Sequence, residues 1–301
     1  MRRNDRRIIS PVRRWYRRHG RSLPWRGESD PYRIILSEIM LQQTQVSRVL
    51  GAYPRFLHRF PSMASLARAR QRDVVLAWRG MGYNNRAVRL HALASVLVER
   101  EMRIPSDAES LLELPGIGRY TAHAILSSVH GLPVPVVDVN IRRLLSRLYW
   151  RIPSTAGMRS EAEIWRTAER ILPRRGVYDW NQALMDIGAT ICTARLPSCS
   201  RCPLGGICAS RKKMTQAKRG TRKAGSGLHG VPGRIYRGRI VEALRRKESG
   251  LRAGTLGKEI NPEFSVHDLP WLESLLAGLE RDGLIRVRRG RTLRDSRVVL
   301  A

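Results

Sequence analysis

Residues 114–125 read LPGIGRYTAHAI, and two glycines in this stretch suggest a tight turn between two helices. Gly116 and Gly118 flank the apolar Ile117. Glycine lets the backbone turn sharply, and amide groups there and at the start of the second helix can face a phosphate. Arg119 adds a positive charge at the same end. The stretch therefore predicts a helix–hairpin–helix, although two helices that only pack together could share the pattern LPGxG.

The rest of the chain is predicted to be mostly helical, because apolar residues recur at three- and four-residue spacing. Ser106 with Glu109 is expected to form a capping box at the start of a short helix. A further amphipathic helix is expected at 12–18, with Trp15 facing inward. No convincing alternation of period two is present before residue 280, so the predicted fold class is mainly α. The expected helices span 33–47, 64–78, 85–101, 107–113, 119–129, 139–149 and 160–172.

The four cysteines of the chain lie close together in the run CTARLPSCSRCPLGGIC. Four thiolates in one short loop suit zinc or an iron–sulfur cluster. A zinc ribbon usually pairs two C-x2-C knuckles, whereas only one is present here. Two disulfides would instead require an oxidising compartment, which nothing else in the sequence indicates. The candidate metal ligands are Cys192, Cys199, Cys202 and Cys208, spaced C-x6-C-x2-C-x5-C.

The charge of the chain indicates its partner. Its 301 residues carry 56 Lys and Arg against 25 Asp and Glu, a formal net charge of +31. Nucleic acid is the leading candidate, because phosphate neutralisation supplies most non-specific affinity. A purely structural nucleic-acid binder would share this charge, so charge alone does not indicate an enzyme. Without a long apolar run or a secretory signal, we expect no membrane partner and a cytoplasmic, nucleoid-associated location.

Taken together, the motifs resemble those of helix–hairpin–helix DNA glycosylases with an iron–sulfur loop, the superfamily of endonuclease III. Within it, the resemblance is closer to the adenine glycosylase, or MutY, family. The matching stretches cover residues 20–210 in family order. They are LPWR (23–26), DPY (30–32), SEIMLQQTQV (37–46), FPS (60–62), GMGYNNRAVRLH (80–91), LPGIGRYTA (114–122), VDVNIRRLLSR (137–147), WNQALMDIGATICTARLPSCSRCPL (180–204) and the final cysteine at 208.

The resemblance implies a glycosylase domain over 1–210, with a 4Fe–4S cluster held by the four cysteines of the loop 192–208. A basic, glycine-rich linker is expected at 211–233. Residues 234–301 are too short for the Nudix-like domain of many relatives. Their expected helices at 235–247, 255–260 and 268–282, with two strands around Gly290, look like a winged helix. Such a domain could bind DNA or serve packing or dimerisation.

Two carboxylates are the candidate catalytic groups. Cleaving a purine N-glycosidic bond requires an acid that protonates the base and a carboxylate that stabilises the sugar cation. Glu38 lies in an apolar helix, where burial would raise its pKa and keep a proton available. Asp138 opens the helix 139–149, where the helix dipole favours its ionised form. By resemblance, Glu38 protonates adenine and handles water, Asp138 stabilises the sugar, and Asn140 joins Asp138. Taken singly, Glu38 could be a buried structural carboxylate and Asp138 an N-cap.

Position 120 separates reaction types within the superfamily. Endonuclease III-like enzymes have a lysine there that attacks the sugar, whereas this chain has Tyr120, which cannot form a Schiff base. The resemblance therefore implies a monofunctional glycosylase that flips a base out of the duplex and leaves an abasic site. It also implies an adenine-side pocket at Arg26, Val46 and Gln182. The candidate DNA-binding residues are Leu41, Gln43, Tyr83, Gly116, Ile117, Gly118 and Arg119.

The expected substrate is double-stranded DNA with adenine opposite 8-oxoguanine or guanine. The chain departs from the family at Asn84, which replaces a second aromatic after Tyr83, and at Val139. One alternative is a thymine or uracil glycosylase that acts on mispairs with guanine. Another is a non-catalytic, DNA-binding regulatory protein with an iron–sulfur cluster. We expect a monomer, with an abasic-site endonuclease and a repair polymerase as downstream partners.

Overall fold

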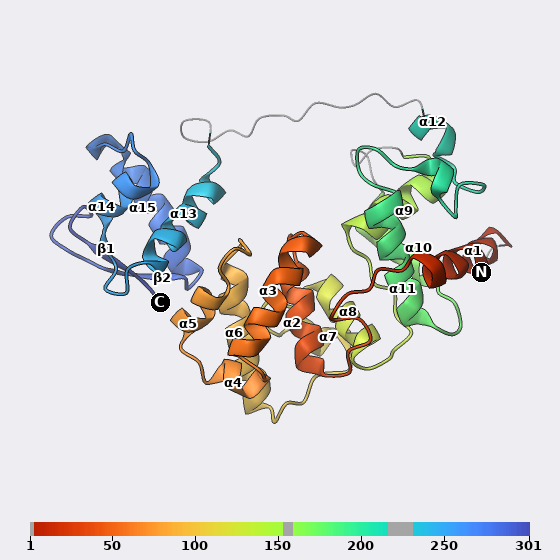
Figure 1. The fold of residues 1–301 in the computed structure, drawn as a ribbon, viewed down its shortest axis with the longest axis horizontal. Helices are drawn as coiled ribbons and strands as arrows, with labels where there is room; N and C mark the ends of the chain where they lie inside the picture. The colour runs from red at the N-terminus through yellow and green to blue at the C-terminus, as the bar shows by residue number, and fades with distance from the viewer. Residues whose placement is uncertain (1–2, 153–158, 216–230) are drawn as a thin grey trace. The chain divides into compact units, whose positions relative to one another are not determined.

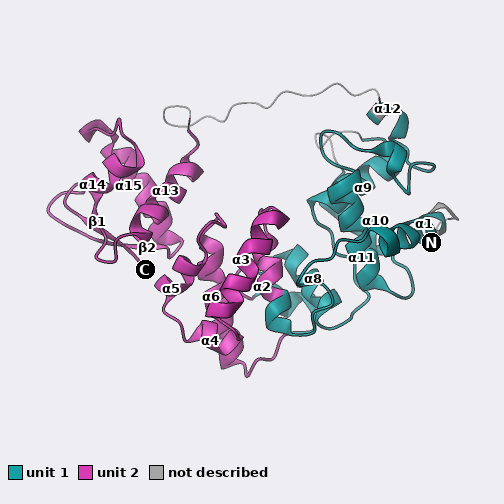
Figure 2. Cartoon of the chain, viewed as in Figure 1, with its two compact units in different colours: residues 1–34, 105–113, 117–222 teal, residues 35–104, 114–116, 223–301 magenta. Residues whose placement is uncertain are grey.

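The computed structural model describes residues 3–152, 159–215 and 231–301 (Figure 1). These residues form two compact units, which are coloured separately in Figure 2. Unit 1 contains the described residues of 1–34, 105–113 and 117–222, and unit 2 contains those of 35–104, 114–116 and 223–301. Residues 231–301 therefore share a compact unit with 35–104. The predicted domains, divided by a linker at 211–233, would have separated these two parts of the chain.

Unit 1 is helical and packs around one apolar core. Ile8 and Val12 of the first helix are fully buried in this core together with residues of the last helices of the unit. This first helix begins nine residues before the predicted range of 12–18. The helices that begin and end inside unit 1 are α1 (Arg3–His19), α7 (Ala108–Leu112), α8 (Arg119–Ser128), α9 (Val139–Trp150), α10 (Glu161–Arg170), α11 (Val177–Asp186) and α12 (Arg211–Thr215).

Helix α11 continues directly into a π-helical turn, η1 (Ile187–Ile191), which packs against α9. Gly188 makes the close approach possible: a Cβ atom there would lie 2.8 Å from Cβ of Asn140 and 3.1 Å from its backbone. The cysteine loop follows η1 and contains a short 3-10 turn, η2 (Cys199–Arg201). The fold thus brings the start of α9 and the entrance of the cysteine loop together.

In unit 2, the predicted helix 33–47 is wrong, because the structure breaks it after Leu41. Helix α2 spans Pro31–Leu41, crossing from unit 1, and α3 begins at Val46. Between them Gln43 has φ +54, in the left-handed region that non-glycine residues rarely adopt. The predicted helix 64–78 is likewise divided in two. The helices after α2 are α3 (Val46–Arg59), α4 (Met63–Ala67), α5 (Gln71–Ala77) and α6 (Asn85–Glu99).

Residues 233–300 have the element order of a winged helix, as predicted. Three antiparallel strands form a sheet in the order β1-β3-β2, and the central β3 pairs with both neighbours. Strand β1 was not predicted, because it has only two residues. The elements are α13 (Gly233–Arg245), β1 (Leu251–Arg252), α14 (Ala253–Ile260), a 3-10 turn at Val266–Asp268, α15 (Leu269–Arg281), β2 (Ile285–Arg288) and β3 (Arg297–Leu300).

Two local predictions need correction. The N-cap of α7 is Asp107, whose carboxylate accepts a hydrogen bond from Ser110 N at 2.8 Å, and not Ser106. The predicted linker begins with helix α12, and most of the linker, residues 216–230, lies outside the described residues. Of the helices that the structure describes, none is both long and apolar enough for a membrane span.

Candidate functional site

The candidate residues fall into two groups, one on each unit. Unit 2 carries Glu38 on α2, and only 7% of this residue is exposed. Its neighbour Ser37 is buried as well, and both lie one turn before the helix ends at Leu41. The predicted burial of Glu38 is therefore confirmed, and its carboxyl lies at the end of a helix that leads into the loop 42–45.

Unit 1 carries Asp138 at the start of α9. Its carboxylate accepts hydrogen bonds from Ile141 N at 2.7 Å and from the side-chain amide of Asn140 at 2.6 Å. The first bond makes Asp138 the N-cap of α9. Burial raises the pKa of Asp138, although these hydrogen bonds and the charge of Arg143 act in the opposite direction. The helix dipole was predicted to favour the ionised form of Asp138, but desolvation is the larger effect on its pKa.

Arg143 connects the catalytic candidates to the cysteine loop. Its guanidinium donates to Oδ1 of Asn140 at 2.9 Å, to the carbonyl of Gly188 at 2.6 Å and to the carbonyl of Cys192 at 2.7 Å. The side chain is buried, so these acceptors replace water. Arg143 therefore fixes the Asn140 amide, which in turn donates to Asp138.

One turn later, Arg147 holds the first part of the cysteine loop. Its guanidinium donates to the carbonyls of Thr193 and Ala194 at 2.7 and 3.0 Å and lies 3.3 Å from Sγ of Cys192. All four cysteines line one small cavity together with apolar side chains, Arg147 and Arg211. None of the four forms a disulfide.

The cysteines have the chemistry of ligands that need a cation. Burial raises the pKa of Cys199 and Cys208, and it raises that of Cys202 to about 11. Thiols in such a place stay neutral unless a positive centre stabilises their thiolates. Among the described residues, no group of three His, Cys, Asp or Glu side chains is arranged to hold a single metal ion.

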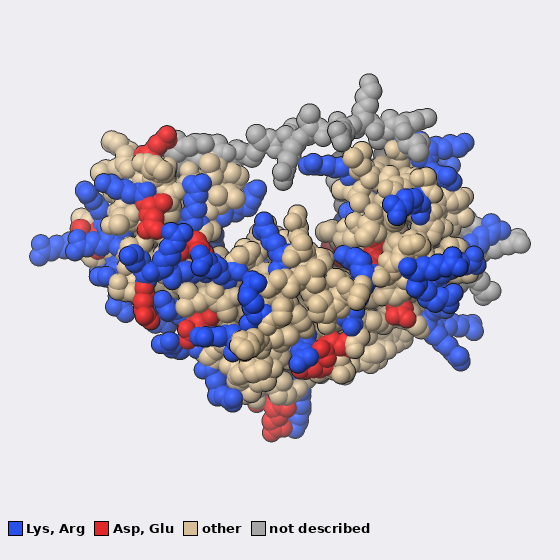
Figure 3. Space-filling view, viewed as in Figure 1, with Lys and Arg blue, Asp and Glu red and all other residues tan. Residues whose placement is uncertain are grey.

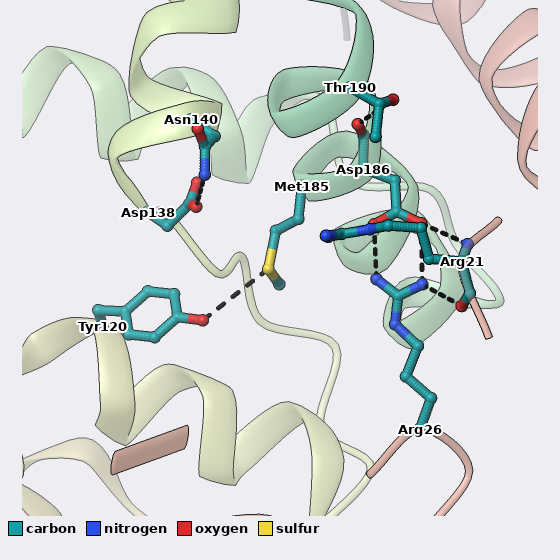
Figure 4. A network of polar contacts seen from close by, with 8 residues as sticks. All are labelled: Arg21, Arg26, Tyr120, Asp138, Asn140, Met185, Asp186 and Thr190. Carbon is teal, nitrogen blue, oxygen red and sulfur yellow. Dashed lines mark hydrogen bonds and ion pairs between the residues drawn. The ribbon is translucent and has the colours of Figure 1, made fainter. Parts of the chain in front are cut away.

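A buried ion-pair network lies on the same unit (Figure 4). Both nitrogens of the Arg26 fork donate to the Asp186 carboxylate, at 2.8 and 2.7 Å, and Arg21 donates to it from its backbone and side chain. Although burial raises the pKa of Asp186, the bonds from Arg26 and Arg21 outweigh it and lower the pKa overall. The guanidinium of Arg26, a predicted pocket residue, is therefore held by Asp186.

Tyr120 lies in the first turn of α8, where its hydroxyl contacts Sδ of Met185 at 3.8 Å (Figure 4). Of the other two predicted pocket residues, Gln182 is half-buried on α11 of unit 1, and Val46 is half-buried at the start of α3 in unit 2. The structure thus brings Tyr120, Asp138 and Asn140 together on one unit with Arg26 and Gln182.

The hairpin has the backbone that its glycines predict. Gly116 has φ +80, and its carbonyl accepts a hydrogen bond from the Gln42 amide at 3.3 Å. Gly118 is the N-cap of α8. Ile117 is only 6% exposed, and the Arg119 guanidinium stacks on the Trp165 ring at 4.1 Å. Backbone amides are therefore the groups of this hairpin that suit a phosphate, as the sequence analysis inferred.

Two loops of unit 2 hold Gln43 and Tyr83 in strained positions. Tyr83 has φ +43 and is 49% exposed, and Gln43 is also exposed. Both loops are held by the buried Arg86 of α6, which donates to the carbonyls of Ile39 and Met40 at the end of α2. Further acceptors of the same guanidinium group are Thr44 Oγ1 and the carbonyls of Met81, Gly82 and Tyr83. Non-glycine residues held in such backbone conformations cluster at functional sites.

Asn84, the predicted departure from the family pattern, contacts the C-terminal elements of unit 2. Its side-chain oxygen accepts a hydrogen bond at 3.0 Å from Arg245 of α13, whose guanidinium also donates to the carbonyl of Val75 at 2.9 Å. Arg245 is buried, with 7% of its side chain exposed. The C-terminal elements are therefore joined to the loop that carries Tyr83.

Sequence reasoning missed the residues that hold the site in place, namely Arg86, Arg143, Arg147 and Asp186. The available signal was their placement: each is a charged residue among the apolar positions of a predicted helix or a quoted motif. Charged residues at such positions are rarely buried without partners, so they mark long-range contacts.

Comparisons with known proteins agree with this geometry. Residues 36–170 match the family described as HhH-GPD superfamily base excision DNA repair protein. The adenine DNA glycosylase of Mycobacterium tuberculosis is 38% identical over 267 residues, which cover 87% of this chain and 86% of that protein. The structure of a thermostable thymine-DNA glycosylase is similar with a TM-score of 0.64 and 28% identity, covering 69% of this chain and 97% of that chain.

The structure of a non-covalent endonuclease III–DNA complex is also similar, with a TM-score of 0.61. It covers 71% of this chain and 99% of that chain at 21% sequence identity. Identity at this level supports a shared fold alone. The predicted helix–hairpin–helix glycosylase fold is confirmed by these matches together.

Proposed function

The chain belongs to the adenine DNA glycosylase family, and from this membership we propose that it excises adenine mispaired with 8-oxoguanine or guanine. The reaction is hydrolysis of the N-glycosidic bond in duplex DNA after the base is flipped out. The product is an abasic site. This assignment favours catalysis over a non-catalytic regulatory role, since the chain retains both candidate carboxyl groups.

The environment of Asp138 is the observation that carries the proposal. Asp138 is half-buried, and its carboxylate receives hydrogen bonds from Ile141 and Asn140 and has a pKa raised by desolvation. A partly desolvated carboxylate of this kind gains when positive charge develops beside it, because the local dielectric constant is lower than that of water. An oxocarbenium-like sugar supplies that charge only in the transition state. The buried Glu38 is the proposed acid that protonates adenine and handles the water.

Tyr120 supports a monofunctional reaction. A phenol cannot form the Schiff base through which an amine cleaves the DNA strand. Its hydroxyl instead lies against Met185 in the first turn of α8. We expect the abasic product to stay intact until alkali or another enzyme cleaves it, and Arg26, Val46 and Gln182 are the proposed adenine-side residues.

The four cysteines are proposed to hold a 4Fe–4S cluster. Three observations support this: their cavity is apolar, Arg147 donates to Cys192, and burial raises the thiol pKa values, so the thiolates would need a positive centre. When bound, the cluster supplies a structural cross-link of the loop. Arg143 and Arg147 connect that loop to α9. Arg143 also binds Asn140, which donates to Asp138.

Double-stranded DNA with adenine mispairs is the proposed substrate partner, bound through the hairpin amides and the loops of Gln43 and Tyr83. The phosphate-facing geometry of helix N-termini supports the first contact. An abasic-site endonuclease and a repair polymerase are the proposed downstream partners of a monomeric enzyme near the nucleoid, because its product is an abasic site.

Single-turnover base release tests the specificity. Duplexes with A:8-oxoguanine, A:G, T:G and U:G would each be analysed with and without hot alkali. We expect alkali-dependent strand breaks at adenine only. Breaks at T:G or U:G would place the chain with the thymine or uracil glycosylases, and breaks without alkali would contradict the monofunctional assignment.

A further inference from the structure

The three-stranded sheet of the C-terminal elements presents a row of arginines. Arg288 of β2 is the register partner of Arg297 of β3, and Arg297 is in turn the partner of Arg252 of β1. Residues directly opposite each other in an antiparallel pair lie on the same face of the sheet. All three arginines are exposed, and Arg286 lies two residues before Arg288 and therefore on this face too. We call these four residues the arginine row.

This arrangement is unfavourable in the isolated protein. Like charges directly opposite in a sheet destabilise it. Among the residues that the structure describes, none of the four pairs with a carboxylate. The only side-chain hydrogen bond described for the row runs from Arg297 Nε to the carbonyl of Ser249, at 2.7 Å. The opposite face of the sheet, with Ile285, Val298 and Leu300, is buried.

The neighbouring helix α15 has a different surface. In a helix-turn-helix protein, the corresponding helix would enter the major groove and contact bases. Here Leu272, Leu276 and Leu279 are buried, and the exposed positions include Glu273, Ser274 and Ala277. The exposed face of α15 carries one arginine, Arg281, at its last position and one carboxylate, Glu273, so it has less positive charge than the sheet. Figure 3 shows Lys and Arg side chains spread over the C-terminal elements, which are those at the left of Figure 1.

We propose that the arginine row binds the phosphate backbone of duplex DNA, so that the winged helix contacts DNA through its sheet and not through α15. Adjacent strands are about 4.8 Å apart, so a row across three strands spans about 10 Å. Each strand of DNA carries one charge per roughly 3.4 Å of helix axis, so the row can face at least two phosphates. The proposal rests on the proposed function only for the choice of DNA as the polyanion.

The test uses the full chain and a fluorescent duplex without a mispair. Arg252→Gln, Arg288→Gln and Arg297→Gln would be combined in one variant, and the Kd measured at several salt concentrations. We expect at least about tenfold weaker binding at low salt. The slope of log Kd against the logarithm of the salt concentration should be smaller by about 2 to 3. The Tm should stay equal or rise, because the cross-strand repulsion is removed. The rate of adenine release at saturating DNA should be unchanged.

The control variant removes the same charge from exposed positions in or directly after helices of the same region, with Arg246→Gln, Lys258→Gln and Arg281→Gln. Equal losses of affinity in the two variants would overturn the proposal, since net charge alone would then explain both. Unchanged affinity of the arginine-row variant for the duplex would also overturn it. Absence of adenine release from the wild type would contradict the proposed function and leave the comparison of the two variants unaffected.

Discussion

At the scale of single residues, the buried Asp186 and the half-buried Asp138 of unit 1 differ in their partners. Asp186 receives hydrogen bonds from two arginines, and its pKa is lowered. Asp138 receives hydrogen bonds from an amide side chain and a backbone N–H, and its pKa is raised. A carboxylate that already has its cations is suited to hold a fold together. One whose hydrogen bonds come from neutral groups is suited to stabilise a positive charge that arises during the reaction.

Glu38→Gln tests the proposed acid. The amide keeps the size of the buried side chain but has no proton to give to adenine. We expect adenine release to fall at least about a hundredfold while duplex binding is retained, because general acid catalysis contributes on that order. Single-turnover base release and fluorescence anisotropy measure the two effects. Glu99→Gln, at an exposed position of α6, is the control, and equal rates in both variants would refute the role of Glu38.

Asp186→Asn tests the ion-pair network. Removing one partner of a buried pair leaves Arg26 without its counter-ion, so the free energy of unfolding at pH 7 should fall by about 3 kcal/mol. Because the folded-state pKa of Asp186 is lowered, its contribution is present above the unfolded-state pKa of about 3.9 and is lost as pH falls through the folded-state pKa. Urea unfolding between pH 7 and pH 3 measures this.

The difference between wild type and Asp186→Asn should therefore shrink at low pH. Asp282→Asn is the control, because its partner Arg237 and Asp282 are each 31% exposed and the loss should stay below about 1 kcal/mol. A difference of the same size at every pH would show that the carboxylate charge is not what stabilises the unit.

At the scale of secondary structure, Arg86 explains where sequence reasoning failed. Apolar spacing continues from Leu41 to Val46, so the pattern predicts one helix across 33–47. The helix ends because Arg86, more than forty positions later, binds the carbonyls of Ile39 and Met40. Capture of the last carbonyls of a helix is a recognised way to end it, but here the donor comes from another element. Local capping at Asp138 was predictable, whereas a cap supplied over this distance was not.

Arg86→Met tests this account of the break. The substitution leaves several buried carbonyls without a donor, so the free energy of unfolding should fall by about 2 to 3 kcal/mol. Adenine release should fall as well, since Gln43 and Tyr83 lose the contact that holds their loops. Arg100→Met, just after the other end of α6 and exposed, should change neither quantity. Unchanged activity in a folded Arg86→Met variant would show that the loops do not depend on this contact.

The cysteine loop is the second element whose role can be tested. Cys202→Ser removes one proposed ligand from a loop that Arg147 ties to α9, so bound iron and sulfide should be lost. The Tm should fall by more than about 5 °C, because ligand binding contributes to folding. Ser200→Ala, an exposed neighbour, serves as the control. Elemental analysis that finds zinc in the wild type would contradict the assigned cluster.

At the scale of the whole molecule, the net charge predicts a polyanion as partner but not where it binds. Placing the charge required the strand register, which puts Arg252, Arg297 and Arg288 in one row although they are far apart in the sequence. The motifs alone were sufficient for the glycosylase fold and its candidate carboxylates, because each motif is local. The residues that hold Asn140 and the loops in place make contacts across many tens of positions, and no local pattern contains their partners.

Adenine excision with Asp138 as a catalytic group is tested most directly by measuring the release of free adenine from an A:8-oxoguanine duplex. The reaction is run under single-turnover conditions, and adenine is detected by chromatography. Wild type should release adenine and leave an alkali-labile, uncleaved strand, and Asp138→Asn should be slower by at least about a hundredfold while still binding the duplex. Absence of adenine release from the wild type would contradict the proposed reaction. An Asp138→Asn variant as fast as wild type would contradict the catalytic role of Asp138.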